Sequence, residues 1–213
     1  LGITTLEDES RFGLSLVLGG GEVKFSELVG AYSTFAQDGV KHDQVFILSV
    51  KDARNNKLEE YKNTGTQVIE PQYIRMLNNI LSDTNARSGL LHSSLSLTQF
   101  EGYDVALKTG TTNDYKDAWV VGYTPFITVG VWVGNSDNTP MQKQGGSILA
   151  AVPIWSDFMR NIVTMYSPET FPKPESVTPQ KPMLDGQYIT KDPLTEKNTV
   201  HSILHFVDKG NIL

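Results

Sequence analysis

A lysine, a glycine and three threonines stand together in the middle of this 213-residue sequence, directly after the apolar run at 105–107. They are Lys108, Thr109, Gly110, Thr111 and Thr112. Hydroxyl groups and an ammonium group can hold a carboxylate, and a glycine lets a substrate backbone approach closely. Because a strand at 105–111 would carry these residues along one short edge, we expect this edge to bind a substrate carboxylate.

The overall composition is that of a globular protein, and it excludes several functional classes. Hydrophobic residues make up 39% of the chain and charged residues 20%. The 18 basic and 24 acidic residues give a net charge of −6, which argues against a nucleic-acid partner, because phosphate contacts need a basic surface. The chain has no cysteine, so it can form neither a disulfide nor a thiolate metal site.

Two other patterns suggest ligand binding, but the residues around them argue against it. His201 and His205 have the i,i+4 spacing of two metal ligands on one helical face, yet no glutamate follows His201. The glycines at 19–21 are not followed by the Gly-Lys-Ser/Thr of a phosphate-binding loop. We therefore predict neither a metal nor a cofactor.

The strands that would carry the edge are close together in the sequence. The pattern predicts strands at 105–111, 118–123 and 127–134, and their short connections favour antiparallel pairing. Two further strands, at 44–50 and 57–61, are expected to form a separate hairpin.

Helices are expected on both sides of these strands in the sequence. A first helix has Ser26 as its expected N-cap, and a second begins at Pro71. Ser147 is the expected N-cap of a last helix, unless that helix begins or kinks at Pro153. The predicted fold class is therefore α+β, an antiparallel sheet flanked by helices.

The composition changes near residue 165. The prolines at 168, 172, 174, 179 and 182 interrupt a polar stretch that is typical of a semi-extended linker. We expect a main domain at 1–165, followed at 166–213 by a Pro-rich linker and tail or the start of a further segment. The sequence begins Leu-Gly-Ile, without methionine or a basic and apolar leader, and we expect it to be part of a longer protein.

The segments 108–113 (Lys-Thr-Gly-Thr-Thr-Asn) and 117–125 (Asp-Ala-Trp-Val-Val-Gly-Tyr-Thr-Pro) resemble the third active-site motif of penicillin-binding protein transpeptidase domains. The resemblance is to the class A, bifunctional type, which joins a glycosyltransferase to a transpeptidase. It extends over about residues 1 to 163 and includes the segments 18–23, 28–36, 138–141 and 151–159. The resemblance implies the C-terminal portion of a penicillin-binding transpeptidase or serine β-lactamase-like fold, in incomplete form.

This resemblance implies part of a peptidoglycan D,D-transpeptidase, a serine acyltransferase. In that family a serine attacks the D-alanyl-D-alanine end of a stem peptide, and an amine from a neighbouring stem peptide resolves the acyl-enzyme. β-Lactams acylate the same serine. The resemblance also implies an extracytoplasmic protein, tethered to the cytoplasmic membrane by a segment outside this chain.

The resemblance assigns a role to each residue of the edge. An extended peptide can lie antiparallel along the strand, with its carboxylate bound by the hydroxyls of Thr109 and Thr111. Lys108 supplies positive potential, Gly110 leaves space, and the Thr111 N–H donates to the oxyanion. Lys108 and Thr111 are thus the candidate catalytic residues, and Thr109, Gly110, Thr111 and Thr112 the candidate substrate-binding residues.

The other two motifs of the family do not occur in the required order. No serine in the sequence is followed three positions later by lysine, and the Thr-x-x-Lys at 178–181 lies in the Pro-rich tail. Ser136, Asp137 and Asn138 spell the second motif, Ser-x-Asn, but they come after Lys108, so we expect a polar turn there. Leu107 replaces the glycine that the family usually has before the lysine.

The sequence therefore predicts one wall of a transpeptidase active site, with the nucleophile supplied by the N-terminal half of the domain. We expect the isolated chain not to acylate, and to expose apolar surface on the strand at 105–107 and the helix at 28–36. One alternative is a non-catalytic module that binds stem peptide or β-lactam on the same fold. Another is a structural domain, which would not need both hydroxyls.

Overall fold

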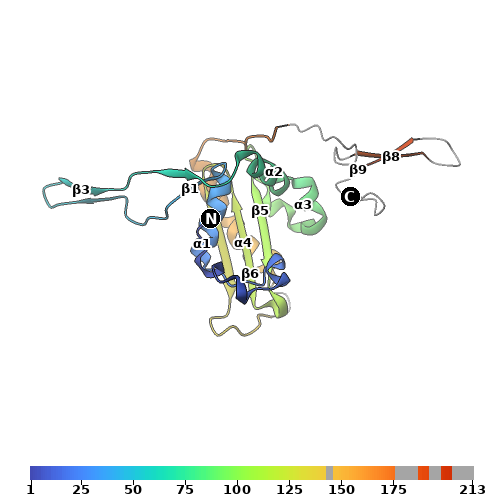
Figure 1. The fold of residues 1–213 in the computed structure, drawn as a ribbon, viewed down its shortest axis with the longest axis horizontal. Helices are drawn as coiled ribbons and strands as arrows, with labels where there is room; N and C mark the ends of the chain where they lie inside the picture. Colours follow the sequence, from blue (N-terminus) through green and yellow to red (C-terminus); the bar gives the residue numbers. More distant parts are fainter. Residues whose placement is uncertain (143–145, 176–186, 192–197, 203–213) are drawn as a thin grey trace. The chain divides into compact units, whose positions relative to one another are not determined.

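The computed structural model describes residues 1–142, 146–175, 187–191 and 198–202 of the chain (Figure 1). The chain divides into two compact units, Leu1–Pro174 and Glu175–Leu213. The second unit contains one antiparallel strand pair, β8 (Gln187–Lys191) and β9 (Asn198–Ser202). The first unit contains the predicted binding edge.

A three-stranded antiparallel sheet forms the centre of the first unit. Its strands are β5 (Ala106–Thr111), β6 (Asp117–Tyr123) and β7 (Thr128–Gly134), in the order β5-β6-β7. Each strand follows the previous one after a short turn, which is why neighbours in sequence are also neighbours in the sheet. The predicted strands and their antiparallel pairing are confirmed.

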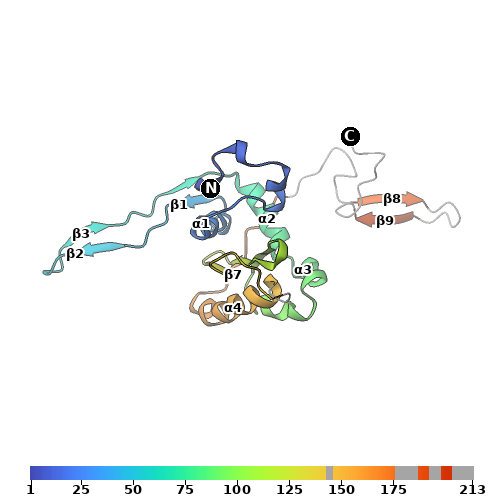
Figure 2. The same ribbon diagram turned by 90° about the horizontal axis from the view of Figure 1, so that it is seen from below.

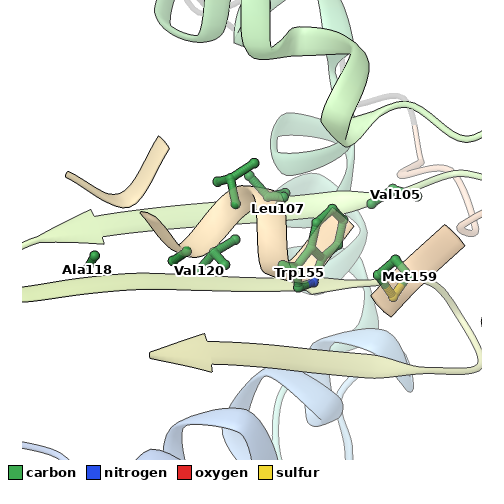
Figure 3. Close-up of a cluster of buried hydrophobic side chains, with 8 residues drawn as sticks. Val105, Leu107, Ala118, Val120, Trp155 and Met159 are labelled. Carbon is green, nitrogen blue, oxygen red and sulfur yellow. The ribbon is translucent and has the colours of Figure 1, made fainter. Parts of the chain in front are cut away.

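Helix α4 (Ser147–Ile162) packs against one face of this sheet (Figures 2 and 3). Trp155 of α4 is fully buried, and its ring occupies the space that a Cβ atom at Gly122 would need. The Trp155 Nε1–H donates to the Val129 carbonyl oxygen at 3.1 Å. The side chains of this core lie together on the strands and the helix; they are Val105, Leu107, Ala118, Val120, Ala151, Val152, Trp155 and Met159.

The N-cap of α4 differs from the sequence-based expectation, because it is Gly146 and not Ser147. Of the alternatives left open at Pro153, a helix start is excluded, since Pro153 lies inside the helix. Ser147 is the first residue of the helix, and its backbone N–H donates to the Thr111 hydroxyl oxygen. Thr111, a strand residue far away in the sequence, therefore accepts the hydrogen bond of an N–H at the start of the helix. In other helices a nearby capping side chain accepts such a bond.

The opposite face of the sheet is covered by α1 (Phe25–Ala36), as the view along the strands shows (Figure 2). A Cβ atom at Gly130 would overlap Val29 and Phe25 of α1, so this glycine permits the close approach of the helix. The N-cap of α1 is Lys24, so the predicted cap at Ser26 is wrong and lies inside the first turn.

Helix α2 (Pro71–Ser82) begins at Pro71, as predicted, and contacts β5. Its Asn78 is buried and donates to the Phe35 carbonyl oxygen of α1 at 3.0 Å. The hydroxyl of Tyr123 in turn donates to Asn78 Oδ1 at 2.7 Å, so one asparagine joins two helices to the sheet.

Shorter elements complete the first unit. Helix α3 (Thr84–Leu91) follows α2, and Asp83 caps it by accepting the Ala86 N–H. The predicted hairpin is present but shorter, as β2 (Ser49–Lys51) paired with β3 (Lys57–Glu60). A further pair, β1 (Val40–His42) with β4 (Gly65–Gln67), flanks it in sequence. The 3₁₀ segments among the described residues of this unit are Thr4–Leu6, Glu9–Arg11, Leu14–Leu18, His92–Thr98, Asn113–Tyr115 and Val163–Met165.

The first unit ends at Pro174, beyond the boundary expected at residue 165. Phe171 is buried and packs its ring edge-on against Tyr123, at a centroid distance of 5.6 Å. Its backbone N–H donates to Asp104 Oδ2 at 3.1 Å. The stretch that contains the first prolines is thus fastened to the main body at Phe171.

The expectation of exposed apolar surface is wrong for the strand at 105–107, whereas the apolar side chains of α1 at 28–36 are mostly only partly buried. Val105, Ala106 and Leu107 are at most 6% exposed, because α4 covers one face and the cluster around Tyr123 and Phe171 covers the other. Exposed apolar side chains occur elsewhere, most of all in the 3₁₀ segment Leu14–Leu18 and before β2. These are Leu14, Val17, Leu18, Phe46, Ile47 and Leu48. Among the described residues, none of the helices combines the length and hydropathy that a membrane crossing requires.

Replacing Tyr123 by phenylalanine is expected to destabilise the fold by about 1–3 kcal/mol, because it leaves Asn78 Oδ1 buried without its donor. Urea denaturation followed by circular dichroism measures this loss. Tyr73→Phe is the matched control, because Tyr73 lies on the same helix as Asn78 and is 66% exposed. Equal midpoints for the two variants would contradict this account of the α2–sheet contact.

Candidate functional site

The predicted binding edge lies on β5, which is an edge strand of the sheet. It pairs with β6 on one side, and within the described part of the chain no strand pairs with its other side. Edge strands present unpaired N–H and C=O groups, and an extended peptide can bind to them by adding a strand. The backbone of β5 is therefore open to a peptide ligand.

The hydrogen-bond pattern determines which backbone groups point outward. The Thr112 N–H donates to the Asp117 carbonyl oxygen at 3.1 Å, which makes Thr112 a hydrogen-bonded partner of Asp117. Because hydrogen-bonded and non-hydrogen-bonded residues alternate along antiparallel strands, the N–H and C=O groups of Thr109 and Thr111 point away from β6. These groups lie on the open edge.

The side chains of the edge alternate between the two faces of the sheet. Leu107 belongs to the core under α4, whereas Ala106 belongs to the cluster on the α1 side. Thr109 and Thr111 therefore share the face of α4, and Lys108 and Gly110 share the opposite face. The two hydroxyls expected to act together lie on one face.

Lys108 is exposed, and its ammonium group lies beside the open edge. Its Nζ donates to the Thr109 carbonyl oxygen at 2.7 Å. Among the described residues it forms no ion pair, so its charge is not neutralised by a neighbouring carboxylate. Lys108 therefore places one positive charge without an ion-pair partner beside the edge.

Gly110 differs from the other glycines of the sheet. A Cβ atom added to Gly110 would lie 3.6 Å from the Trp119 Cβ, which is an ordinary van der Waals contact. Cβ atoms at Gly122, Gly130 and Gly134 would instead overlap neighbouring side chains. The packing of this chain therefore requires glycine at the other three positions but not at Gly110.

The hydroxyl of Thr111 contacts the first turn of α4. Its Oγ1 accepts the Ser147 N–H at 3.0 Å and donates to the Ser147 hydroxyl oxygen at 3.1 Å. Sequence reasoning missed Ser147 as a partner, because the two residues are 36 positions apart and no local pattern connects them. The end of β5 is thereby fixed to the start of α4.

Thr112 closes the turn that follows β5. Its Oγ1 donates to Asp117 Oδ2 at 2.9 Å and accepts the Asp117 N–H at 2.8 Å. The other oxygen of that carboxylate accepts the Trp132 Nε1–H at 2.8 Å. Asp114 and Tyr115 have positive φ angles of 61° and 55° in the same turn. The Thr112 hydroxyl is thus engaged in holding the turn.

The Ser136-Asp137-Asn138 triplet forms a polar turn after β7, as predicted. The Asn138 N–H donates to the Asn135 carbonyl oxygen at 3.0 Å, and Asn138 has a positive φ of 59°. The Thr139 hydroxyl, and then the Thr139 N–H, lower the pKa of Asp137 by donating to its carboxylate. These contacts are those of a local turn.

His205 and the residues 178–181 lie outside the described residues. No group of three or more histidine, aspartate or glutamate side chains in the described part of the chain is arranged to hold a metal ion.

The chain matches known proteins over most of its length. The family model for the penicillin binding protein transpeptidase domain matches residues 12–160. Penicillin-binding protein 1A of Aquifex aeolicus is 34% identical over 160 residues, 75% of this chain and 21% of that protein. Penicillin-binding protein 1A of Neisseria gonorrhoeae is 31% identical over 185 residues, 84% of this chain and 22% of that protein.

Solved structures resemble the fold. PonA1, a penicillin-binding protein of Mycobacterium tuberculosis, matches with a TM-score of 0.69 and 29% identity, over 85% of this chain and 53% of that chain. Penicillin-binding protein 1A of Haemophilus influenzae matches with a TM-score of 0.65 at 16% identity, over 92% of this chain and 34% of that chain, which supports the fold alone.

The chain spans about a fifth of the length of the curated relatives that it matches. The family model nevertheless covers more than half of the chain, and it includes the whole edge from Lys108 to Thr112. The relatives and the fold point to the same class. The chain therefore belongs to the penicillin-binding protein transpeptidase family, as part of a class A transpeptidase domain.

Proposed function

We propose that this chain supplies the substrate-binding wall of a peptidoglycan D,D-transpeptidase, which cross-links stem peptides through a serine acyl-enzyme. The ligand of the wall is the stem peptide ending in D-Ala-D-Ala, and β-lactams occupy the same place. The observation that carries the proposal is Gly110, a glycine on an open edge strand that the packing of the chain does not require. A peptide ligand needs free space beside the polar edge of β5 for its backbone, and a glycine at this position leaves that space.

The peptide lies antiparallel along β5 as an added strand. The outward-pointing backbone groups of Thr109 and Thr111 are suited to pair with it. Gly110 lies between them, so no side chain obstructs the ligand on the face that Lys108 shares. The open edge thus supplies both the hydrogen bonds and the space.

The terminal carboxylate binds at the end of this strand. The hydroxyls of Thr109 and Thr111 donate to it, and the unpaired ammonium of Lys108 lowers the free energy of the bound anion. The outward orientation of the Thr111 N–H supports its role as an oxyanion donor, where charge develops on the attacked carbonyl. Thr112 contributes by closing the turn that holds Thr111 in place.

The nucleophile and its base come from another part of the protein, because the 213 residues contain no Ser-x-x-Lys sequence. That serine attacks the penultimate D-alanine carbonyl and expels the terminal D-alanine, and an amine then takes the acyl group. Among the structural neighbours, PonA1 of Mycobacterium tuberculosis has been solved in complex with penicillin V, at 29% identity to this chain. This supports β-lactam binding here.

The proposed substrate also implies the location. Peptidoglycan cross-linking takes place outside the cytoplasmic membrane, so we place the protein there, tethered by a segment outside this chain. The alternative is a non-catalytic module that binds stem peptide or β-lactam by the same edge, and acylation distinguishes the two.

Gly110→Ala in the full-length protein is expected to slow acylation by a fluorescent penicillin roughly 10- to 100-fold, because the new methyl group displaces the ligand backbone. Its unfolding free energy should change by less than about 0.5 kcal/mol, since the methyl group meets only an ordinary contact within the chain. Acylation reactions quenched at a series of times give the acylation rate, and urea denaturation gives the unfolding free energy.

Gly130→Ala is the matched control for this prediction. Its methyl group overlaps Val29 and Phe25 of α1, on the other side of the sheet from the α4–Thr111 contact, so it should destabilise the fold by about 1–3 kcal/mol and slow acylation only through loss of folded protein. If Gly110→Ala acylates at the wild-type rate, Gly110 does not keep space for a ligand and the proposed wall is wrong.

The isolated 213-residue chain is expected not to acylate, because it lacks the serine nucleophile. Intact-mass spectrometry after incubation with the fluorescent penicillin detects a covalent adduct, and the full-length protein is the positive control. An adduct at one equivalent on the isolated chain would refute the proposed division of the active site. Binding without acylation by the full-length protein would favour the non-catalytic alternative.

A further inference from the structure

The contact between Thr111 and Ser147 connects the binding edge to the start of α4. Ser147 is only 6% exposed, and its N–H donates to Thr111 Oγ1 at 3.0 Å. The N-cap residue Gly146 has no side chain that could cap the helix. Thr111 therefore satisfies a donor that the helix cannot satisfy locally.

This contact restricts what the Thr111 hydroxyl can do. A hydroxyl has one proton to donate and two lone pairs to accept with. One lone pair of Thr111 already accepts the Ser147 N–H, and the Thr111 hydroxyl donates its proton to the Ser147 hydroxyl oxygen at 3.1 Å. When Thr111 donates its proton to a ligand, the Ser147 hydroxyl can rotate and donate to the second lone pair of Thr111. All the hydrogen bonds of both hydroxyls are then kept.

We propose that Ser147 is a positioning residue for Thr111 in carboxylate binding. Its backbone N–H fixes the Thr111 oxygen, and its hydroxyl, which accepts the Thr111 proton in the structure, becomes the donor to Thr111 when that proton turns to the ligand. This inference rests on the proposed function of the edge and adds a residue from α4 to it.

The position of the Ser147 N–H is itself fixed by the core. Trp155 lies on the same helix, fills the space above Gly122 and donates to the Val129 carbonyl oxygen. Ala151 and Val152 are fully buried between these two points. Because α4 cannot slide without disrupting this packing, the helix holds the Thr111 oxygen at a constant place.

The test separates the N–H of Ser147 from its hydroxyl. Ser147→Pro removes both groups at the first helical position, whose φ proline accepts, and its Cδ atom replaces the N–H that Thr111 Oγ1 binds. The residue before it, Gly146, has φ −67° and ψ 159°, a conformation that proline accepts in its predecessor. Ser147→Ala removes only the hydroxyl and keeps the N–H.

The full-length protein and these variants are compared in their acylation by a penicillin with a free carboxylate and by its methyl ester. Ser147→Pro should lower the carboxylate-to-ester ratio of second-order rate constants roughly tenfold, since one positioning hydrogen bond is lost. Ser147→Ala should lower it by no more than about threefold, because the N–H still holds Thr111. Thermal melting establishes that each variant is folded.

The outcomes separate the inference from the function on which it rests. A wild-type protein that reacts with neither compound overturns both. A wild-type protein with a high carboxylate-to-ester ratio that Ser147→Pro leaves unchanged overturns only the positioning role. Equal losses with both compounds would also overturn it, because they would indicate a general structural effect.

A second measurement applies if Ser147→Pro does not fold. A double-mutant cycle of Ser147→Ala and Thr111→Val is then expected to be non-additive in the carboxylate-to-ester ratio, because the two hydroxyls act on one proton. Additive effects would contradict the inference. Ser147→Thr, which keeps both groups, should preserve the wild-type ratio.

Discussion

The packing of Trp155 over Gly122 is the contact on which the rest of the first unit depends. The indole ring takes the space that any larger residue at Gly122 would fill, and its N–H binds the Val129 carbonyl oxygen. This contact sets how closely α4 approaches the sheet. Ser147 precedes Trp155 by about two helical turns, roughly 12 Å at 1.5 Å per residue. The start of the helix therefore reaches the end of β5, so a single packing contact also determines where Thr111 is bound.

The edge strand has two parts with different environments. Ala106 and Leu107 are buried on opposite faces of the sheet, whereas Lys108 is exposed and Gly110 has free space around it. The buried part anchors the strand, and the open part presents its backbone to a ligand. At the far end, the turn of Thr112, Asp117 and Trp132 holds the strand again. Because both ends are fixed, the open part loses little further conformational entropy when a peptide pairs with it.

The sequence predicted the elements better than it predicted their contacts. The three strands and the start of α2 at Pro71 follow from local patterns of apolar residues and turns, and the structure confirms them. The hydrogen bond at the start of α4 could not be predicted, because Thr111, the partner of Ser147, is 36 residues away in the sequence. The buried state of 105–107 was missed for a similar reason, since Phe171 covers part of it from a segment expected to be linker. Periodicity determines which face of an element is apolar, but not which other element covers that face.

Two glycines of the sheet, Gly110 and Gly122, have different physical reasons for being glycine, and the structure distinguishes them. In the sequence, Gly110 and Gly122 are both glycines in predicted strands. In the structure, Gly122 is required by the Trp155 ring, whereas Gly110 meets only an ordinary contact within the chain. A glycine that packing does not require must be explained by the backbone conformation or by a ligand. The φ angle of Gly110 lies outside the positive range that favours glycine, so the backbone does not require it either. What remains is the space beside the open edge, which is where the proposed peptide lies.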